Sequence, residues 1–221
     1  MDVYTAVETR RAIRAFTADP IPPGVLNRVL SAAGRAPSGA NLQPWNLYLV
    51  TGAALEGLKT RASGRVAAGD PGDESEYPMY PPVLPSPYRE RRAAAAEQRY
   101  HALGIERNDT HGRAAHVAGN WDCFGAPAAL FCYVDPVMGP PQWADVGMYL
   151  QTVMLLLRAE GLHSCPQMAW SVYHRTVAEL LCPLDGAILF CGMSIGYADP
   201  ATPHPSIDRA PLTETVTFLD S

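Results

Sequence analysis

The sequence has very little lysine, no excess of positive charge and no long hydrophobic run. Lys59 is the only lysine among 17 basic residues, and the formal net charge is -5 at pH 7. Proteins that bind nucleic acids carry a basic patch or stripe, so this charge balance argues against a nucleic-acid partner. The longest nearly apolar run is Met148–Leu157, whereas a helix needs about 20 apolar residues to cross a bilayer. No membrane association is therefore predicted.

Paired cysteines and an export signal are also missing. The cysteines number five, which is odd, and no two of them have CxxC spacing. The first residues, Met1–Arg11, are polar and mixed in charge, unlike a signal peptide. We expect reduced, mostly buried thiols in a cytoplasmic protein.

Several motifs that define common enzyme classes are absent. No GxGxxG follows a predicted strand and no GxxxxGK[ST] is present, which argues against a Rossmann site and a P-loop. HExxH is absent as well, so a zinc protease is not indicated. His111 and His116 have the wrong spacing for two metal ligands on one helical face. We interpret them as solvated or hydrogen-bonded side chains, and no metal is predicted.

Length and composition favour one α+β domain. The chain has 221 residues, 48% of them hydrophobic and 18% charged, which is a globular composition. Helical patterns outnumber strand patterns in a mixed order, so we expect a helix-covered sheet in a single domain over residues 1–221. Helices are predicted at Asp2–Thr9, Pro22–Arg35, Ala53–Ala68, Arg89–Leu103, Thr110–Cys123, Ala144–Glu160 and Val172–Leu181, and strands at Asn46–Thr51, Ala126–Val134, Ala187–Ser194 and Glu214–Leu219.

A segment rich in proline and tyrosine, residues 69–88, interrupts these elements. Five prolines lie in Pro78–Pro87, so the segment is neither a regular helix nor a central strand. Long irregular segments in compact domains are usually functional or disordered. We expect this excursion to line or cover a substrate entrance, with a flexible surface insertion as the alternative.

The first candidate binding motif is an arginine cluster. Arg10, Arg11 and Arg14 precede Phe16, and a helical turn between Arg10 and Arg14 would direct both toward one anion. Arginine offers permanently charged, bidentate donors, which suit a phosphate monoester. The alternative is a solvated basic turn that closes the first helix.

The second candidate motif is the loop Ala36–Trp45, which precedes a predicted strand. Ser38 supplies a hydroxyl, and Asn41 and Gln43 supply carboxamides. Carboxamides both donate and accept hydrogen bonds, which suits a ribityl chain or a uracil-like ring edge. An ordinary turn with local side-chain bonding is equally compatible with this sequence.

Together with segments nearer the C-terminus, these motifs resemble the FMN-dependent nitroreductase family. Arg-Arg-x-x-Arg-x-Phe, Pro-Ser-x-x-Asn-x-Gln-Pro-Trp, Gly-Leu-x-Ser-Cys and a terminal Gly-x-x-x-Gly-Tyr occur in family order. The resemblance covers residues 1–58 and 121–219 and is weak across residues 60–120. The Trp121–Pro127 run resembles the branch that includes nitrobenzoate and nitrophenol reductases.

The resemblance implies an α+β fold with a mixed central sheet, an intertwined homodimer and two FMN sites at the subunit interface. By the same resemblance Arg10 and Arg209 would bind the FMN phosphate, with Arg11 beside them and Gly196 nearby. Without the resemblance, we interpret Arg209 as a surface charge. Arg14 would contact the pyrimidine edge or the ribityl chain.

The remaining flavin contacts implied by the resemblance come from two loops. The contacts from the partner subunit would be Ser38, Asn41 and Gln43, and those beside the isoalloxazine ring would be Pro166, Gln167, Met168 and Ala169. Ala12 departs from the family pattern, which often has serine there. The missing hydroxyl would weaken phosphate binding by roughly 1–3 kcal/mol unless Arg11 or water replaces it.

The implied activity is NAD(P)H-dependent reduction of nitroaromatic or quinone-type acceptors by ping-pong hydride transfer through flavin N5. Arg14 would stabilise the reduced flavin. Trp121, Phe124, Tyr80 and Tyr88 would form aromatic walls for a small aromatic acceptor, with core packing as the alternative for Trp121 and Phe124. A flavin ene-reductase, a dehalogenase, a biosynthetic oxidase and a non-enzymatic flavin-binding protein are the alternative functions.

Overall fold

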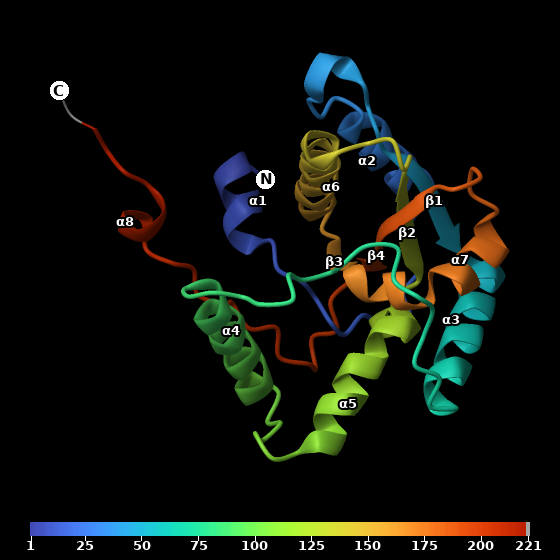
Figure 1. Ribbon diagram of the computed structural model, residues 1–221. Helices are drawn as coiled ribbons and strands as arrows, with labels where there is room; N and C mark the ends of the chain where they lie inside the picture. The colour runs from blue at the N-terminus through green and yellow to red at the C-terminus, as the bar shows by residue number, and fades with distance from the viewer. Residues whose placement is uncertain (220–221) are drawn as a thin grey trace.

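The computed structural model describes residues 1–219, which fold around a four-stranded antiparallel sheet (Figure 1). Strand β2 (Ala128–Val134) is central and pairs with β1 (Asn46–Thr51) on one side and β4 (Ile188–Gly196) on the other. β3 (His163–Gln167) pairs with β4 and lies at the edge. Every residue of β2 is buried, as its continuous apolar sequence predicts.

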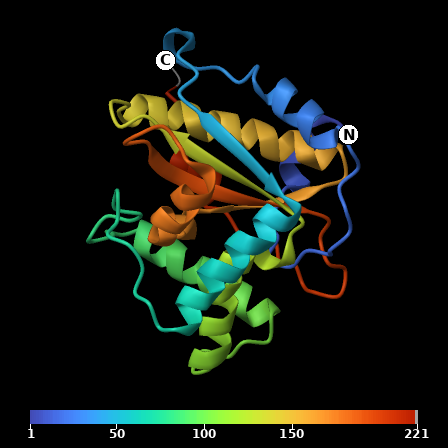
Figure 2. The ribbon, with the colours of Figure 1, turned by 90° about the vertical axis from the view of Figure 1, so that its right-hand side faces the viewer.

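Helices cover both faces of this sheet. The α-helices are α1 (Val3–Thr9), α2 (Val25–Ala33), α3 (Gly52–Ala67), α4 (Tyr88–Ala102), α5 (Thr110–Ala118), α6 (Pro140–Ala159), α7 (His174–Leu181) and α8 (Leu212–Thr215). The short 3-10 segments are η1 (Gly39–Asn41), η2 (Gly119–Gly125) and η3 (Met168–Tyr173). Figure 2 shows the sheet between α2 and α6 on one face and α3 and α7 on the other.

The alternation of side chains along β2 builds two separate cores. Leu130 and Cys132 pack with residues of α2 and α6, whereas Phe131 and Tyr133 pack with residues of α3 and α7. Successive residues of a strand point to opposite faces, so one apolar strand serves both cores. Because both faces are covered, a ligand site has to lie at an edge of the sheet rather than on its faces.

The sheet differs from expectation in its pairing. The sequence predicts a mixed sheet, but the four strands of the observed sheet pair antiparallel. Parallel pairing is found in the isolated bridge between Ala12 and Ser164. The sequence pattern does not predict β3, because Pro166 removes one backbone donor. The edge position of β3 explains why a proline is tolerated there.

Two further expectations are wrong. The predicted strand Glu214–Leu219 begins inside α8, and residues 216–219 pair with no strand described in residues 1–219. An alternating pattern forms a strand only beside a partner edge, and this segment extends away from the body (Figure 1). The predicted helix Thr110–Cys123 ends at Ala118, and Cys123 has a φ of 51°.

The cysteine prediction is confirmed across the part of the chain that the structure describes. The five cysteines are free, and four of them are buried while Cys182 is exposed. Burial raises the pKa of the Cys165 thiol to about 11 and that of Cys191 to about 12, so both are protonated at neutral pH. No helix within residues 1–219 is long and apolar enough to cross a membrane.

Candidate functional site

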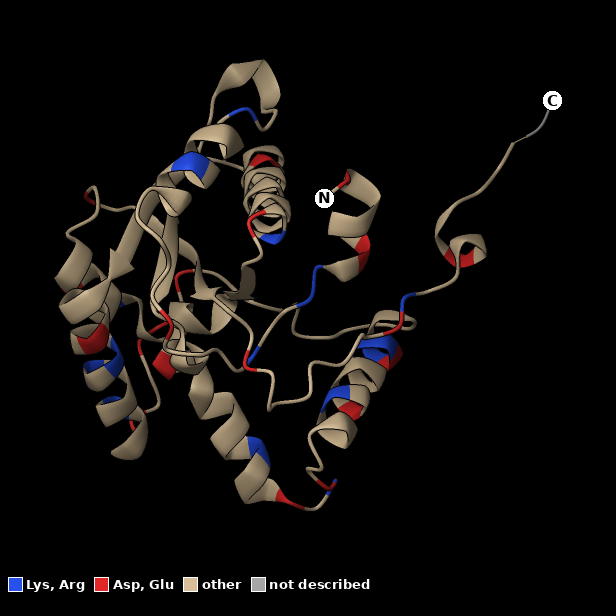
Figure 3. Cartoon of the chain, turned by 180° about the vertical axis from the view of Figure 1, so that it is seen from behind, with Lys and Arg blue, Asp and Glu red and all other residues tan. Residues whose placement is uncertain are grey.

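An arginine-lined cavity of about 610 Å³ lies among α1, α4, α6 and the segment 202–209. This volume is within the usual range of ligand pockets, roughly 300–1,000 Å³. Figure 3 shows basic residues on the chain after α1, along α4 and before α8. The cavity brings together five arginines from segments far apart in the sequence: Arg10, Arg11, Arg14, Arg99 and Arg209.

Extended backbone, not a helix, positions the N-terminal arginines. α1 ends at Thr9 and Arg10 already has extended backbone angles, so the predicted helical turn between Arg10 and Arg14 is wrong. Ile13 donates its N–H to the Ser164 carbonyl at 3.1 Å and is buried in the core. Alternation along extended chain directs Arg14 to the side opposite Ile13. Side chains four residues apart on an extended chain point to the same side, so Arg10 and Arg14 still reach the same cavity.

The cavity carries uncompensated positive charge. Within residues 1–219, none of its five arginines forms an ion pair, and Glu8 is the one carboxylate in its lining. Arg11 donates to the His204 carbonyl at 2.9 Å, and Arg209 donates to the Ile207 carbonyl at 2.6 Å. Burial and the charge of Arg209 lower the pKa of Arg10. This group of like charges, of which Arg10, Arg14 and Arg99 are partly buried, favours an anionic ligand.

The segment predicted to lie beside the flavin ring, residues 166–169, spans the end of β3 and the start of η3. Gln167 is buried and donates through Nε2 to the Asn120 carbonyl at 2.7 Å, while its Oε1 accepts from Ser194. The Gln167 side chain thus points into the protein and fixes the backbone of residues 166–169. Pro166, Met168 and Ala169 do not line the arginine cavity. Their contact with a flavin stays a prediction.

The loop predicted to serve the partner subunit is strained and lies outside the arginine cavity. Asn41 and Gln43 have φ values of 58° and 51°, a left-handed conformation that non-glycine residues rarely adopt. Gln43 donates its N–H to Ser38 Oγ at 3.0 Å, and Gly39 donates to Asp145 Oδ2 at 3.1 Å. Backbone strain of this kind is concentrated at binding sites. Whether the loop reaches a partner's ligand stays a prediction.

The four predicted substrate aromatics have different surroundings, and their contact with a substrate stays a prediction. Phe124 is buried, and its ring centroid is 6.1 Å from that of His116. Trp121 packs edge-on against Tyr173 at 5.3 Å. The exposed residues of the set are Tyr80, which lies under the Arg92 guanidinium at 4.3 Å, and Tyr88.

Gly196, predicted near the phosphate, is buried at the end of β4. A Cβ there would lie 2.8 Å from Pro127 Cδ and 3.1 Å from Phe16 Cδ1. Close packing therefore accounts for glycine at this position, and its contact with a phosphate stays a prediction.

Two cavity residues were not predicted as site residues from the sequence: Arg99, and His116, which was interpreted as a solvated or hydrogen-bonded side chain. They reach the cavity from α4 and α5. Both lie in residues 60–120, where the family resemblance is weak. Burial and the charges of Arg14 and Arg99 lower the pKa of His116 to about 4, so its ring is neutral at pH 7. No local pattern marks either residue, because their place in the cavity depends on how α4 and α5 pack.

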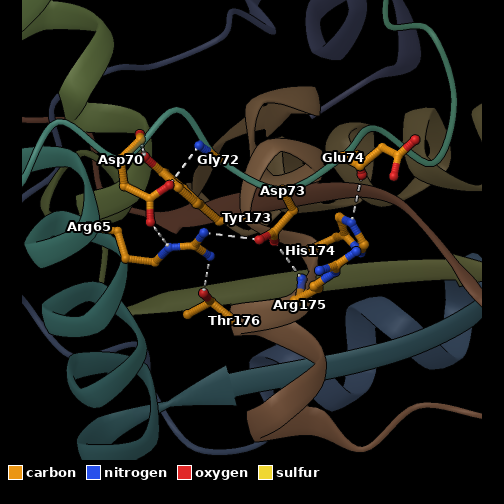
Figure 4. A network of polar contacts seen from close by, with 9 residues as sticks. All are labelled: Arg65, Asp70, Gly72, Asp73, Glu74, Tyr173, His174, Arg175 and Thr176. Carbon is orange, nitrogen blue, oxygen red and sulfur yellow. Dashed lines mark hydrogen bonds and ion pairs between the residues drawn. The ribbon is translucent and has the colours of Figure 1, made fainter.

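The first half of the excursion is firmly attached to η3 and α7 (Figure 4). Arg65 forms ion pairs with Asp70 at 2.7 Å and Asp73 at 2.9 Å. Asp73 also donates its N–H to the Val172 carbonyl at 2.7 Å. The hydrogen bond from Arg65 lowers the pKa of Asp70. These contacts hold residues 70–73 against the segment that follows Gln167.

Tyr77 continues this attachment toward β4. Its hydroxyl donates to the Phe190 carbonyl and lies 3.9 Å from Met168 Sδ, and its ring packs edge-on against Trp143. In contrast, Met79, Tyr80 and Val83 are exposed. The excursion therefore has an attached half, residues 70–77, and an exposed half, residues 78–87.

The arginine cavity and the covered faces of the sheet together indicate a protein that binds an anionic ligand beside the edge of its sheet. Comparisons with known proteins identify its family. A model described as the nitroreductase family matches residues 7–197. The chain is 35% identical over 198 residues to the 4-nitrobenzoate reductase of Pseudomonas putida, covering 90% of this chain and 86% of that protein.

Two further matches cover nearly the whole chain. The nitrobenzene nitroreductase of Ectopseudomonas oleovorans is 35% identical over 215 residues, 96% of this chain and 95% of that protein. The crystal structure of the FMN and NADPH-dependent nitroreductase NfnB from Sphigopyxis sp. strain HMH matches with a TM-score of 0.96 and 42% identity over 100% of both chains. The chain belongs to the nitroreductase family.

Proposed function

We propose that this protein is an FMN-dependent oxidoreductase that uses NADPH to reduce nitroaromatic or quinone-type acceptors. The observation that carries the proposal is the arginine cavity. None of its five arginines forms an ion pair with another residue of 1–219. The full-length similarity to an FMN and NADPH-dependent nitroreductase supports the same assignment. The relatives that match most of the chain favour nitro reduction over the ene-reductase, dehalogenase, oxidase and binding-protein alternatives.

The residues present fit FMN on two observations. A phosphate monoester carries close to two negative charges at pH 7, and Arg10 and Arg209 lie close enough for one charge to affect the other. Two other residues of the same cavity have buried polar atoms with no hydrogen-bond partner among residues 1–219, namely Arg99 Nε and His116 Nε2. When bound, FMN would supply the hydride-accepting and hydride-donating centre, N5.

Within this proposal, the protein binds and orients the cofactor. Arg10 and Arg209 would hold the phosphate, and Arg14 would lie toward the pyrimidine edge. Ala12 lines the cavity and offers no hydroxyl, so the phosphate would depend more strongly on the two guanidinium groups. The backbone fixed by Gln167 would flank the ring, and acceptor and NADPH would occupy the same face in turn.

Analysis of the bound cofactor tests the assignment. We expect the purified protein to release FMN on heating, and NADPH to bleach the bound flavin in an anaerobic stopped-flow experiment. Nitrobenzene, 4-nitrobenzoate and a quinone should each restore the oxidised spectrum. Release of FAD, or a flavin that NADPH does not reduce, would contradict the proposal.

We propose that the protein is a homodimer with parts of both flavin sites from each subunit. Apolar side chains exposed on α1, on α6 and near the C-terminus are Val3, Tyr4, Val7, Met148, Leu212, Val216, Phe218 and Leu219. Exposed apolar surface of this extent is typical of an interface. The strained loop with Asn41 and Gln43 also lies apart from the arginine cavity of its own chain.

Light scattering should give about twice the chain mass of 23.9 kDa. Met148→Arg on the exposed side of α6 should shift the protein toward monomer and reduce its FMN content, because a charge is then buried in the interface. Val137→Arg is the matched control, since Val137 is 81% exposed in the loop before α6. A stable wild-type monomer with full FMN occupancy would disprove the dimer proposal.

We further propose that residues 1–221 form one domain and that the excursion lines the acceptor entrance. The contact between Tyr77 and Met168 supports this, because it connects the attached half to the segment assigned to the flavin ring. The tyrosines of the exposed half offer aromatic faces with polar ends. A cytoplasmic location, based on the unpaired cysteines, stays a prediction.

A further inference from the structure

Arg99 brings an unsatisfied donor into the arginine cavity from a helix outside the recognised motifs. Its Nε is buried and has no hydrogen-bond partner within residues 1–219. Its guanidinium carbon lies 5.6 Å from the centre of the Tyr100 ring. Buried donors are nearly always paired in folded proteins, so the lone Nε calls for an acceptor from a ligand.

The number of arginines in the cavity exceeds what one phosphate group requires. Five arginines face one carboxylate, that of Glu8, which forms no ion pair within residues 1–219. Arg10 and Arg209 suffice for a phosphate dianion. Arg11 already donates to the His204 carbonyl, so Arg14 and Arg99 are left. Burial and the charge of Arg14 lower the pKa of Arg99. Two neighbouring cations of this kind favour a second electron-rich group between them.

The Arg14 and Arg99 pair lies next to β3. The bridge from Ala12 to Ser164 places Arg14 alongside this strand. Both guanidinium groups are close enough to Cys165 of β3 to oppose the rise in its pKa. Cys165 is two residues before Gln167, whose backbone is assigned to the flavin ring. The second electron-rich group therefore belongs to the ring end of the ligand and not to its phosphate end.

We propose that Arg99 acts with Arg14 to bind the N1 and C2-carbonyl edge of the FMN ring and to stabilise the negative charge of that edge in the reduced cofactor. The inference rests on the proposed function and adds α4 to the flavin site. The polar ring edge offers acceptors to Arg99 Nε. Two fixed cations in a half-buried cavity also favour the reduced, more negative form of the ligand.

The test measures the reduction potential of FMN bound to the holoenzyme. Arg99→Gln and Arg99→Met, which keeps the packing of the side-chain stem, remove the charge. We expect both variants to bind reduced FMN at least tenfold more weakly relative to oxidised FMN. For a two-electron couple this lowers the potential by about 30 mV. Arg99→Lys should retain most of the wild-type potential.

Arg89→Gln is the matched control, because Arg89 is on the same helix and its side chain is 72% exposed. It should leave the potential unchanged. Wild-type potentials in both neutral variants would overturn the inference. So would a change confined to KM for 4-nitrobenzoate relative to nitrobenzene, which would assign Arg99 to an acceptor carboxylate, or a change confined to KM for NADPH relative to NADH. A wild-type protein without FMN would instead refute the proposed function.

Discussion

Arg10→Gln should reduce FMN affinity about 10- to 150-fold, the largest expected effect of a single substitution in the cavity. A hydrogen bond between charged groups contributes about 1.5–3 kcal/mol, and a tenfold change in affinity corresponds to about 1.4 kcal/mol. Arg10 is half-buried and has no carboxylate partner within residues 1–219. Without Arg10, Arg209 would face the phosphate dianion with one guanidinium less. Fluorescence titration of the apoprotein with FMN measures the loss.

Arg35→Gln is the control for this substitution, because it removes one exposed arginine that does not line the cavity. It should bind FMN as the wild type does. If Arg10→Gln binds FMN with wild-type affinity, Arg10 does not contact the phosphate. An equal loss in both variants would show that net charge, and not the cavity, governs binding.

Gly72→Ala should detach the first half of the excursion and destabilise the protein by about 2–6 kcal/mol, because strain and overpacking each contribute about 1–3 kcal/mol. Gly72 has a φ of 99°, and a Cβ there would lie 2.3 Å from Val172 Cγ1 and 2.7 Å from the Val172 carbonyl oxygen. The obstacle is backbone of η3, which is held in place by its own packing. Urea unfolding measures the loss.

Gly69→Ala separates conformational strain from the steric clash. Gly69 has a φ of 71°, but no atom of another described residue lies within 4 Å of a Cβ at that position. Its cost should be about 1–2 kcal/mol, from the left-handed conformation alone. If the excursion lines the acceptor entrance, Gly72→Ala should also change the ranking of nitroarenes against quinones while FMN content is retained. Equal destabilisation by both variants, with unchanged acceptor ranking, would contradict this account.

Local pattern was sufficient for β2, which is buried on both faces. Its continuous apolar run leaves one structural solution, because such residues have to be covered on both sides. Local pattern failed for β3, where Pro166 is acceptable only because the strand lies at an edge. It failed again at residues 214–219, where alternation occurs with no adjoining strand in residues 1–219.

The candidate site shows the same division. The family resemblance led to Arg10 and Arg209 at the phosphate, to Arg14 at the ring edge or ribityl chain, and to FMN as cofactor, and the residue type agrees because arginine is a permanently charged, bidentate donor. The reason first given for Arg10 and Arg14, a shared helical turn, is wrong, and the extended chain anchored by Ile13 replaces it. Sequence periodicity alone did not distinguish these two geometries.

By itself, the sequence determined the family, the class of fold, the cofactor chemistry and the absence of motifs for several rival enzyme classes. These properties depend on residue types and their order, which no folding step alters. Only the tertiary structure decided that Arg99 and His116 join the arginine cavity and that residues 70–73 are fixed to α3 by Arg65 and to η3 by the hydrogen bond from Asp73 to Val172. Those contacts join segments far apart in the chain, and their geometry depends on packing between layers, which local sequence does not encode.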